Sequence, residues 1–560
     1  MKYIALYLFC AFMVLVLGIS PSLNAQCDSI GWSSDPAVNL NVSPWGQNPH
    51  ACTDGQGGVY ILWNTNSFTT FQYLQHVDRC GIIQWAAPLE IRGEWNGTRF
   101  FPDLAEDEFG GALAAYTEWR VSGQQPWPSR VRVNRVDVNG NLLWGAYGVR
   151  VSLKDTSQFL PQVVPDGQGG AFVTYGVLDD SLFIQHISPT GERLWGDEGI
   201  FLGRTNLNFD HILISDEQGG IIVEWYMGPP TFNSGFKRLD NQENVLWTDT
   251  SSVFYNAIVP DGIGGAALGG VRVYSGLRDI VANHISPDGL FLWGNTGVLI
   301  EDSLGAYSKV NDIVLRADSV LVVYWMNVID LQSDYQALIQ MITPEGELFF
   351  PQGSIPPSII PSSTRSAAGA ILSNNNSTIF LFVDQSAVYA QKIDSAGGLV
   401  WDSSDVTFSY LPRQYVSNVS DKMGGLINFG SDEPLHGIFM HQISKNGNLG
   451  EVLDSISEIR IGAKIDIPQT FALSINYPNP FNSSTVIRYY LSSFSEVELK
   501  VYNGLGQEIK KLASNMFLPG HYEFKWEGID ENGQSVSSGV YYYRLKVNGR
   551  SETRKMVLIR

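Results

Sequence analysis

Short stretches in which apolar and polar residues alternate run along most of this chain. Near the C-terminus, residues 496–501 read EVELKV and residues 541–547 read YYYRLKV. This period of two is the pattern of a strand with one buried face. Turn sequences such as Asn532-Gly533 separate the stretches. The pattern predicts about six or seven short strands in residues 470–560, arranged as a small immunoglobulin-like β-sandwich.

The strand pattern upstream is a repeat that runs from about residue 27 to about residue 462. One half of the unit is an Asp-x-x-Gly-Gly turn followed by an apolar strand, as in TDGQGGVYILW at 53–63. The other half is a strand, a Gly turn and an aromatic residue, as in HISPTGERLW at 186–195. The aromatic residues recur about every fifty positions, at Trp85, Trp144, Trp195, Trp247, Trp293, Phe350 and Trp401. The half-unit at 438–451 has lost its Trp.

Each repeat offers four short strands, and no segment has a helical period. A four-stranded unit of about fifty residues with a fixed aromatic is typical of a β-propeller blade. We therefore predict an all-β chain with a propeller of about eight blades, the aromatic residues being buried between them. Seven blades would result if the unit near 360–400 is divided differently, and a linear β-array is the third alternative. Either residues 36–42 or residues 457–461 should close the ring by joining a blade from the opposite terminus.

Two charged positions recur once per repeat. The acidic residues are Asp54, Asp107, Asp166, Asp216, Asp261 and Asp421. We interpret each as the cap of its own turn, because a calcium site needs several oxygens around one ion. The cations are His76, Arg135, His186, Arg238, His284 and Lys392. We expect these to be solvated or at blade edges rather than metal ligands.

The C-terminal segment also carries specific motifs. They are YPNPFN (Tyr477, Pro478, Asn479, Pro480, Phe481 and Asn482), VYNGLGQEI at 501–509, SGVYYYRL at 538–545 and the ending KMVLIR. Residues 470–560 resemble the C-terminal sorting domain of proteins that pass through the type IX (Por) secretion system of Bacteroidetes-like bacteria. The resemblance implies recognition by that machinery, followed by removal of the domain or its use for surface attachment. Because Pro cannot donate to a sheet ladder, YPNPFN should be the rigid entry to the first strand rather than lie inside it.

The N-terminus agrees with export. Lys2 precedes an apolar run over 3–19, and small residues follow up to Ala25. This indicates a signal peptide over 1–25, cut near Ala25–Gln26. We find no transmembrane anchor elsewhere in the sequence. The expected organisation is a signal peptide (1–25), a propeller (26–462), a linker (463–469) and a sorting domain (470–560), in a secreted or surface-attached protein.

The amino-acid composition restricts the classes of partner and the possible disulfides. Only 16% of residues are charged, aromatic residues make up 12%, and the net charge is −20. Nucleic acid and anionic membrane surfaces are therefore excluded as partners. After signal-peptide removal Cys27, Cys52 and Cys80 remain. One disulfide is expected in an oxidising compartment, with Cys52–Cys80 preferred over a pair using Cys27, and CxxC metal spacing is absent.

No catalytic, cofactor or metal motif stands out in the sequence. Glu118 and Glu224 lie near aromatic residues but nothing brings them together. The best candidate binding surface is the insertion-like loop 118–128, in which Trp119 and Trp127, like Trp95, could stack on sugar rings; the alternative is a long variable connection. We expect a non-catalytic binding or structural module for a glycan or protein. The alternative is a polysaccharide hydrolase or lyase, which should gather acids at one mouth of the channel. The repeats more loosely resemble Gly-Gly/Trp repeats of secreted proteins with this sorting domain.

Overall fold

The chain divides into two compact units, residues 1–456 and residues 457–560. The computed structural model describes residues 27, 31–36, 39–65, 71–95, 98–120, 128–205, 211–228, 233–274, 277–304, 308–330, 334–358, 364–372, 376–383, 387–401, 405–409, 413–432, 437–450, 471–473, 476, 479, 481–491, 495–504, 506–517, 520–531 and 533–559. Within these ranges the secondary structure is almost entirely β-strand, with no α-helix. Accordingly, the described residues include no helix that is long and apolar enough to cross a membrane. The predicted signal peptide and linker lie outside the described residues.

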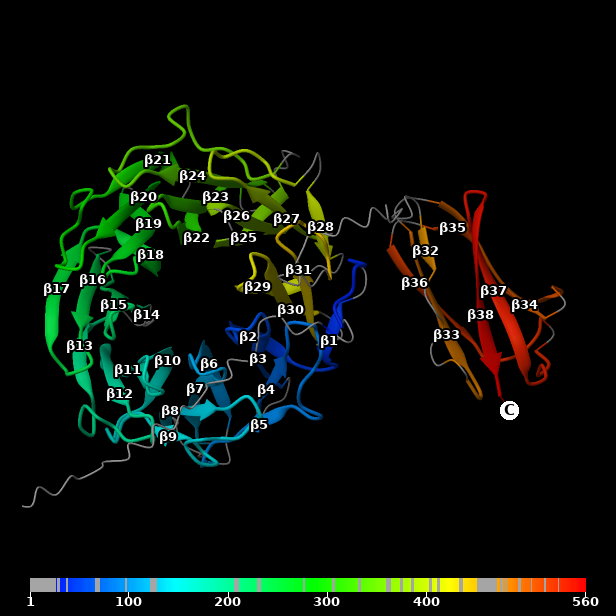
Figure 1. The fold of residues 1–560 in the computed structure, drawn as a ribbon, viewed down its shortest axis with the longest axis horizontal. Helices are drawn as coiled ribbons and strands as arrows, with labels where there is room; N and C mark the ends of the chain where they lie inside the picture. The colour runs from blue at the N-terminus through cyan, green and yellow to red at the C-terminus, as the bar shows by residue number, and fades with distance from the viewer. Residues whose placement is uncertain are drawn as a thin grey trace, which may run out of the picture. The chain divides into compact units, whose positions relative to one another are not determined.

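The first unit is a ring of eight blades of antiparallel strands, which follow one another in chain order (Figure 1). Blades 1 to 4 are β2 Gln47–Thr53, β3 Val59–Asn64, β4 Gln72–Val77 and β5 Leu89–Ile91; β6 Arg99–Glu106, β7 Ala112–Trp119, β8 Ser129–Val136 and β9 Val149–Arg150; β10 Gln158–Pro165, β11 Ala171–Val177, β12 Ser181–Ile187 and β13 Ile200–Arg204; and β14 His211–Ser215, β15 Ile221–Tyr226, β16 Ser234–Leu239 and β17 Val245–Ser251. Blades 5 to 8 are β18 Phe254–Pro260, β19 Ala266–Tyr274, β20 Leu277–Ile285 and β21 Val298–Leu304; β22 Lys309–Leu315, β23 Leu321–Asp330 and β24 Asp334–Ile342; β25 Thr364–Leu372, β26 Thr378–Val383, β27 Val388–Ile393 and β28 Val406–Ser409; and β29 Arg413–Ser420, β30 Leu426–Asp432 and β31 Ile438–Ile443 with β1 Leu40–Ser43.

The first strand of each blade lies nearest the centre of the ring (Figure 1). Each of these inner strands contacts the inner strand of the next blade, and β29 contacts β2. The ring is therefore closed, and the fold is the eight-bladed propeller expected from the repeats. Blades 6 and 7 are joined into one sheet because β24 pairs in parallel with β25. A single bridge between Ile339 and Ile355 takes the place of a fourth strand in blade 6.

The N-terminal segment closes the ring. Strand β1 pairs antiparallel with β31 and completes blade 8. Ahead of β1, the indole N–H of Trp32 donates to the carbonyl of Arg79 at 2.9 Å. In the same way Trp85 donates to Val138 at 3.1 Å in the next interface. Trp32 thus fills the position that residues 438–451 leave without a Trp, and of the two predicted closing segments the one at 36–42 is correct.

The preferred disulfide Cys52–Cys80 is wrong, because the structure joins Cys27 to Cys80 with 5.9 Å between their Cα atoms. Cys52 is a buried free thiol on β2, packed against Leu104 and Tyr60 between blades 1 and 2. Strand β3 separates β2 from β4. Two strand spacings amount to about 10 Å, beyond the reach of a disulfide. The bond that does form ties the closing segment to blade 1.

The recurring aromatic residues are buried between blades, as expected. Trp195 is 5% exposed and packs against Phe172, with ring centroids 5.4 Å apart. Its cluster includes Leu213 and Val223 from the following blade. In the interface between blades 1 and 2, Trp85 lies on Gly140, whose φ of +82° and lack of a Cβ allow the ring within van der Waals range. A Gly in the turn and a Trp one blade earlier are therefore a packed pair.

The second unit is a sandwich of two antiparallel sheets, with strand orders β32-β33-β36 and β35-β34-β37-β38. Its strands are β32 Phe471–Leu473, β33 Thr485–Leu491, β34 Ser495–Asn503, β35 Glu508–Phe517, β36 Gly520–Trp526, β37 Gly539–Val547 and β38 Arg550–Leu558. The alternating apolar residues of β34 and β37 face its core, as Leu499 and Tyr543 illustrate with 0% exposure. The predicted immunoglobulin-like sandwich is confirmed.

Candidate functional site on blades 1 and 2

The two faces of the ring differ in how regular their loops are. The Asp-x-x-Gly-Gly turns between the first and second strands of a blade lie on one face, as do the Gly turns after the third strand, because antiparallel strands alternate in direction. The opposite face carries the connections between second and third strands and those between blades. These connections vary in length, from a short turn at 178–180 to the loop 120–128. We call this second face the loop face.

The repeated Asp residues hold the regular face together. Oδ1 of Asp166 accepts the N–H groups of Gln168 and Gly170 at 2.8 and 2.7 Å, so each such residue caps its own turn as predicted. Its Oδ2 lies 2.9 Å from Nε2 of His186. The recurrent cation is therefore neither solvated nor at a blade edge, and that expectation is wrong: His186 is 5% exposed. No cluster of three or more metal-binding side chains occurs among the described residues.

Polar side chains on the inner strands bridge neighbouring blades. Oδ2 of Asp103 accepts the N–H of Val163 at 2.8 Å, and the Gln162 amide donates to His211 and accepts from Leu213. Burial raises the pKa of Asp103, which nearby N–H groups and His50 partly offset. Inner strands of neighbouring blades diverge and do not form backbone hydrogen bonds with one another. These side chains make the contacts between them instead, so their role is structural.

Glu118 and Glu224, which nothing in the sequence brings together, are also apart in the structure. Glu118 lies on β7 of blade 2 and Glu224 on β15 of blade 4, with the whole of blade 3 between them. Glu118 forms an ion pair with Arg132 at 2.6 Å, and Glu224 accepts a hydrogen bond from the Ser234 hydroxyl. Each carboxylate already has a partner in its own blade, so the two cannot act on one substrate.

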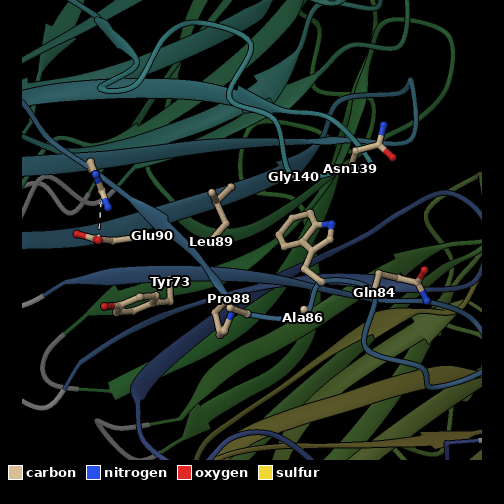
Figure 2. A pocket seen from close by; sticks show the side chains of 11 residues that line it. Tyr73, Gln84, Ala86, Pro88, Leu89, Glu90, Asn139 and Gly140 are labelled. Carbon is tan, nitrogen blue, oxygen red and sulfur yellow. Dashed lines mark hydrogen bonds and ion pairs between the residues drawn. The ribbon is translucent and has the colours of Figure 1, made fainter.

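A surface hollow of about 590 Å³ lies along the outer edge of blade 1, where it meets the Gly turn of blade 2 (Figure 2). Tyr73 and Glu90 lie at one end and Asn139 at the other, with Pro88 and Leu89 between them (Figure 2). Trp85 also lines it, and its indole is fixed by the hydrogen bond to Val138. Aromatic surface beside amide groups is the composition of a site for a polar, ring-shaped ligand.

A charged cluster lies at the loop-face end of the same two blades. Glu118 is its centre and is 1% exposed. One oxygen accepts from Nε of Arg132 at 2.6 Å, and the other accepts the backbone N–H of Trp95 at 3.2 Å. Glu94 forms ion pairs with Arg132 and, at 3.1 Å, with Arg130. Burial and the charge of Arg150 lower the pKa of Arg130, and the carboxylates of Glu118 and Glu94 partly offset this effect.

The predicted binding loop begins at this cluster. Trp119 is half-buried at the end of β7 and packs edge-to-face on Phe100, with centroids 5.3 Å apart. Trp95, which the sequence also singled out, is half-buried with the Arg130 guanidinium 3.3 Å from its ring centroid. Trp127 lies outside the described residues. The structure therefore places Trp95 and the first residues of the loop together. No motif or spacing in the sequence singled out the arginines of this cluster.

The described part of the YPNPFN motif contacts the last strand of the chain. The N–H of Phe481 donates to Val557 at 3.0 Å, and the N–H of Ile559 donates back to Phe481 at 2.9 Å. The side chain of Asn479 accepts the N–H of Val557 at 2.9 Å. Phe481 is 3% exposed and packs on Trp526, while Asn482 is exposed. Tyr477, Pro478 and Pro480 lie outside the described residues.

The chain resembles known proteins in its C-terminal domain and in its overall β-fold. Residues 481–551 match the FlgD Ig-like domain family, and no curated protein matches the chain. Among solved structures, the chain is similar to PorZ, a bacterial surface component of the type-IX secretion system of Porphyromonas gingivalis, with 9% identity over 91% of this chain and 81% of that one and a TM-score of 0.24. The β-propeller domain of the Trilobed protease from Pyrococcus furiosus has 10% identity, covering 64% and 99%, with a TM-score of 0.37. The BP39L lectin from Burkholderia pseudomallei has 11% identity, covering 63% and 98%, with the same TM-score. At these scores no functional argument follows from the likeness.

Proposed function

We propose that this protein is exported by its signal peptide and carried by type IX secretion to the cell surface or the medium, with residues 470–560 as the sorting domain. The observation that carries the proposal is the YPNPFN motif together with its contacts. Asn479 and Phe481 bind the strand that runs into the C-terminal KMVLIR sequence. The two ends of the sorting segment thus form one folded element that machinery could recognise as a unit.

The sorting claim is tested by deleting residues 470–560 and locating the protein by cell fractionation. The truncated chain should accumulate in the periplasm, and a periplasmic reporter fused to 470–560 should reach the surface or the medium. Phe481→Ala should impair export because it removes a buried side chain that fixes the last strand. Asn482→Ala, in the same motif but exposed, is the matched control and should be exported normally. Surface display of the truncated chain would refute the proposal.

The propeller, in this proposal, is a non-catalytic module that binds a ligand on its loop face and outer edge at blades 1 and 2. Its support is that three buried acids of the propeller are already hydrogen-bonded within the protein. Asp103 bonds to a neighbouring inner strand, and Glu118 and Glu224 are each bound within one blade. The hollow beside Trp85 and Tyr73 instead offers aromatic and amide surface.

The binding role is tested on the purified full chain with a glycan array and a polysaccharide-degradation panel run in parallel. We expect retention of a glycan or a protein ligand without turnover. Trp85→Ala should weaken that retention, whereas Trp401→Ala, at the equivalent position of blade 7, should not. Turnover of any polysaccharide that is lost on replacing Asp103 or Glu118 would favour the hydrolase or lyase instead.

A further inference from the structure

Residues 470–560 differ in charge from the rest of the chain. They hold eleven Lys and Arg residues against eight Asp and Glu residues, which gives a net charge of +3. The whole chain has a formal net charge of −20, so the residues before 470 carry −23. A strong acidic excess therefore gives way to a basic excess in the C-terminal sandwich. The positions of these basic side chains on the sandwich determine what they can bind.

Part of the basic excess lies on the outer face of the four-stranded sheet. Leu499 and Tyr543 face the core of the sandwich. The next residues along their strands, Lys500 and Arg544, therefore project from the opposite side of the sheet. Lys511 on β35 is directly opposite Lys500 on β34, which is directly opposite Arg544 on β37. Side chains in such positions are about 5 Å apart at Cβ, and like charges there destabilise a sheet. This row of three cations therefore does not serve the stability of the sandwich.

The acids near this row are already in use. Nζ of Lys500 lies 3.0 Å from a carboxylate oxygen of Glu498 and 3.2 Å from one of Glu508. The hydrogen bond from Lys500, together with the positive charges around it, lowers the pKa of Glu498. Glu531 accepts the backbone N–H of Lys511 at 2.6 Å, but its ion pair is with the lysine before it. The middle cation of the row is thus neutralised, whereas the two outer cations are not.

The two outer cations are accessible to another molecule. Lys511 and Arg544 are both exposed, and neither forms an ion pair with any residue that the structure describes. Arg544 is nevertheless held in place. Its Nε donates to the hydroxyl of Thr553 at 3.1 Å, and its Cζ lies 5.0 Å from the ring centroid of Tyr502. An exposed guanidinium that is already oriented and lacks a counter-ion is suited to pair with a carboxylate of a partner.

An aromatic and an apolar side chain lie beside these cations on the same face. Tyr542 is 37% exposed and Val540 is 42% exposed. Another exposed cation, Lys555 on β38, is directly opposite Tyr542. Tyr and Arg are enriched at protein interfaces and among the residues that contribute most to binding. The composition of this face is thus that of a protein docking surface and not of a site for a small anion.

We propose that this face docks onto an acidic surface of a protein of the export machinery. We call it the basic face and define it by Lys500, Lys511, Arg544, Tyr542 and Lys555. The proposal rests on the sorting role of residues 470–560 and names the side of the domain that is recognised. Complementary charge would orient the domain on its partner. An anionic membrane would attract the basic face but repel the preceding residues, which carry −23. A protein with a local acidic surface meets the basic face alone, so the charges favour a protein partner.

The test reverses the outer charges in the full chain and measures the exported fraction by cell fractionation. Lys511→Glu and Arg544→Glu each place a carboxylate opposite Lys500. Because Lys511→Glu replaces a like-charge pair by an opposite-charge pair, it should leave the melting temperature unchanged or higher. The exported fraction should fall about tenfold or more for both, since a carboxylate facing an acidic partner opposes docking. Arg544→Lys keeps the charge and should retain most of the export. Lys525→Glu is the matched control, because it changes the net charge equally at a 59% exposed side chain of the other sheet. It should be exported normally.

Four results would overturn the proposal. Normal export of both Lys511→Glu and Arg544→Glu would show that the basic face is not recognised. An equal loss for Lys525→Glu would indicate an effect of net charge, and a loss that follows a lowered melting temperature would indicate a structural role. Purified full chain is also sedimented with phosphatidylglycerol vesicles and should stay in the supernatant. Co-sedimentation that Arg544→Glu abolishes would identify a lipid surface as the partner instead. If deletion of residues 470–560 still traps the chain while the reversed variants are exported, the basic face fails but the sorting role stands.

Discussion

Nε2 of His76 lies 2.9 Å from Oδ2 of Asp54, and both side chains are buried. The same relationship recurs around the ring in pairs of alternating type: His186–Asp166 and His284–Asp261 with histidine, Arg135–Asp107 and Arg238–Asp216 with arginine. One carboxylate thus caps a turn with one oxygen and binds a basic side chain of the third strand with the other. The Asp signal and the cation signal of the repeat are two halves of a single element.

Whether the basic residue is arginine or histidine should determine how much each pair contributes to the stability of the fold. Asp216→Ala leaves Arg238 buried and charged, because arginine cannot lose its proton, and should lower the free energy of unfolding by about 3–5 kcal/mol. Asp166→Ala in the adjacent blade leaves a histidine that can become neutral, together with two unpaired turn N–H groups. It should cost about 1–3 kcal/mol. Denaturant unfolding of the full chain followed by tryptophan fluorescence measures both.

The two variants form a matched pair, since Asp166 and Asp216 have the same turn hydrogen bonds and similar burial. Equal losses would mean that turn capping, and not the cation, dominates. A double variant Asp216→Ala with Arg238→Met should recover much of the loss, because it removes the unpaired charge. Absence of such recovery would contradict the electrostatic explanation.

Most of the propeller could be predicted from the sequence because its information is local and repeated. The alternation of apolar residues and the turn glycines predicted the strands of each blade, and the regular spacing of the aromatic residues predicted the number of blades. Trp32 was missed as the eighth aromatic residue, although it precedes Trp85 by about the same interval as the others. The charged cluster around Glu118 could not be predicted, because it depends on how the connection between blades 1 and 2 folds onto the strands of blade 2. The disulfide was misassigned for the same reason, since the order of strands in the sheet decides which cysteines are near.

Burial of Trp195 should be a major contribution to one interblade interface. Trp195→Ala removes an indole that is 5% exposed and packs on Phe172, and should lower the free energy of unfolding by about 3–5 kcal/mol. Trp45→Ala provides the control, because that indole is 40% exposed. It should cost less than about 1 kcal/mol. Similar losses for the two variants in denaturant titrations would show that burial between blades is not the main contribution of these tryptophans to the free energy of unfolding.

Asp312 should make stability depend on pH near neutrality. Burial raises its pKa to about 6, although the N–H groups of Ala370 and Ile313 partly offset this effect. A carboxyl whose folded pKa lies above its unfolded value of about 3.9 stabilises the fold below that unfolded value. The contribution is lost as pH rises through about 6. The stability of the unaltered chain relative to Asp312→Asn should therefore be lower at about pH 8 than at about pH 4, by on the order of 2–3 kcal/mol.

Thermal unfolding of the two chains across this pH range measures the difference. Asp288→Asn, at an exposed turn position of blade 5, is the control and should leave the pH profile unchanged. Carboxyls with a lowered pKa act in the opposite direction. For Asp166 burial favours the neutral form, but hydrogen bonds from His186 and the turn N–H groups outweigh it and lower its pKa, so its contribution is lost in acid. These other carboxyls are present in both chains, so their contributions cancel when the unaltered chain is compared with Asp312→Asn. If the stabilities of the two chains changed with pH in parallel, the raised pKa of Asp312 would be contradicted.

Ring closure should depend on Trp32 and on the disulfide next to it. Trp32 is 4% exposed, donates to Arg79 and lies on Gly81, so Trp32→Ala removes its large buried side chain from the interface between blades 8 and 1. We expect a loss of about 3–5 kcal/mol. Cys27→Ser frees the closing segment from blade 1 and should cost about 2–4 kcal/mol, because the bond no longer restricts the unfolded chain. Both act on the same segment, so the double variant should lose less than the sum of the two. Limited proteolysis should then cut first near β1. Additive losses, or first cleavage in a blade away from this interface, would mean that the N-terminal segment is not what keeps the ring closed.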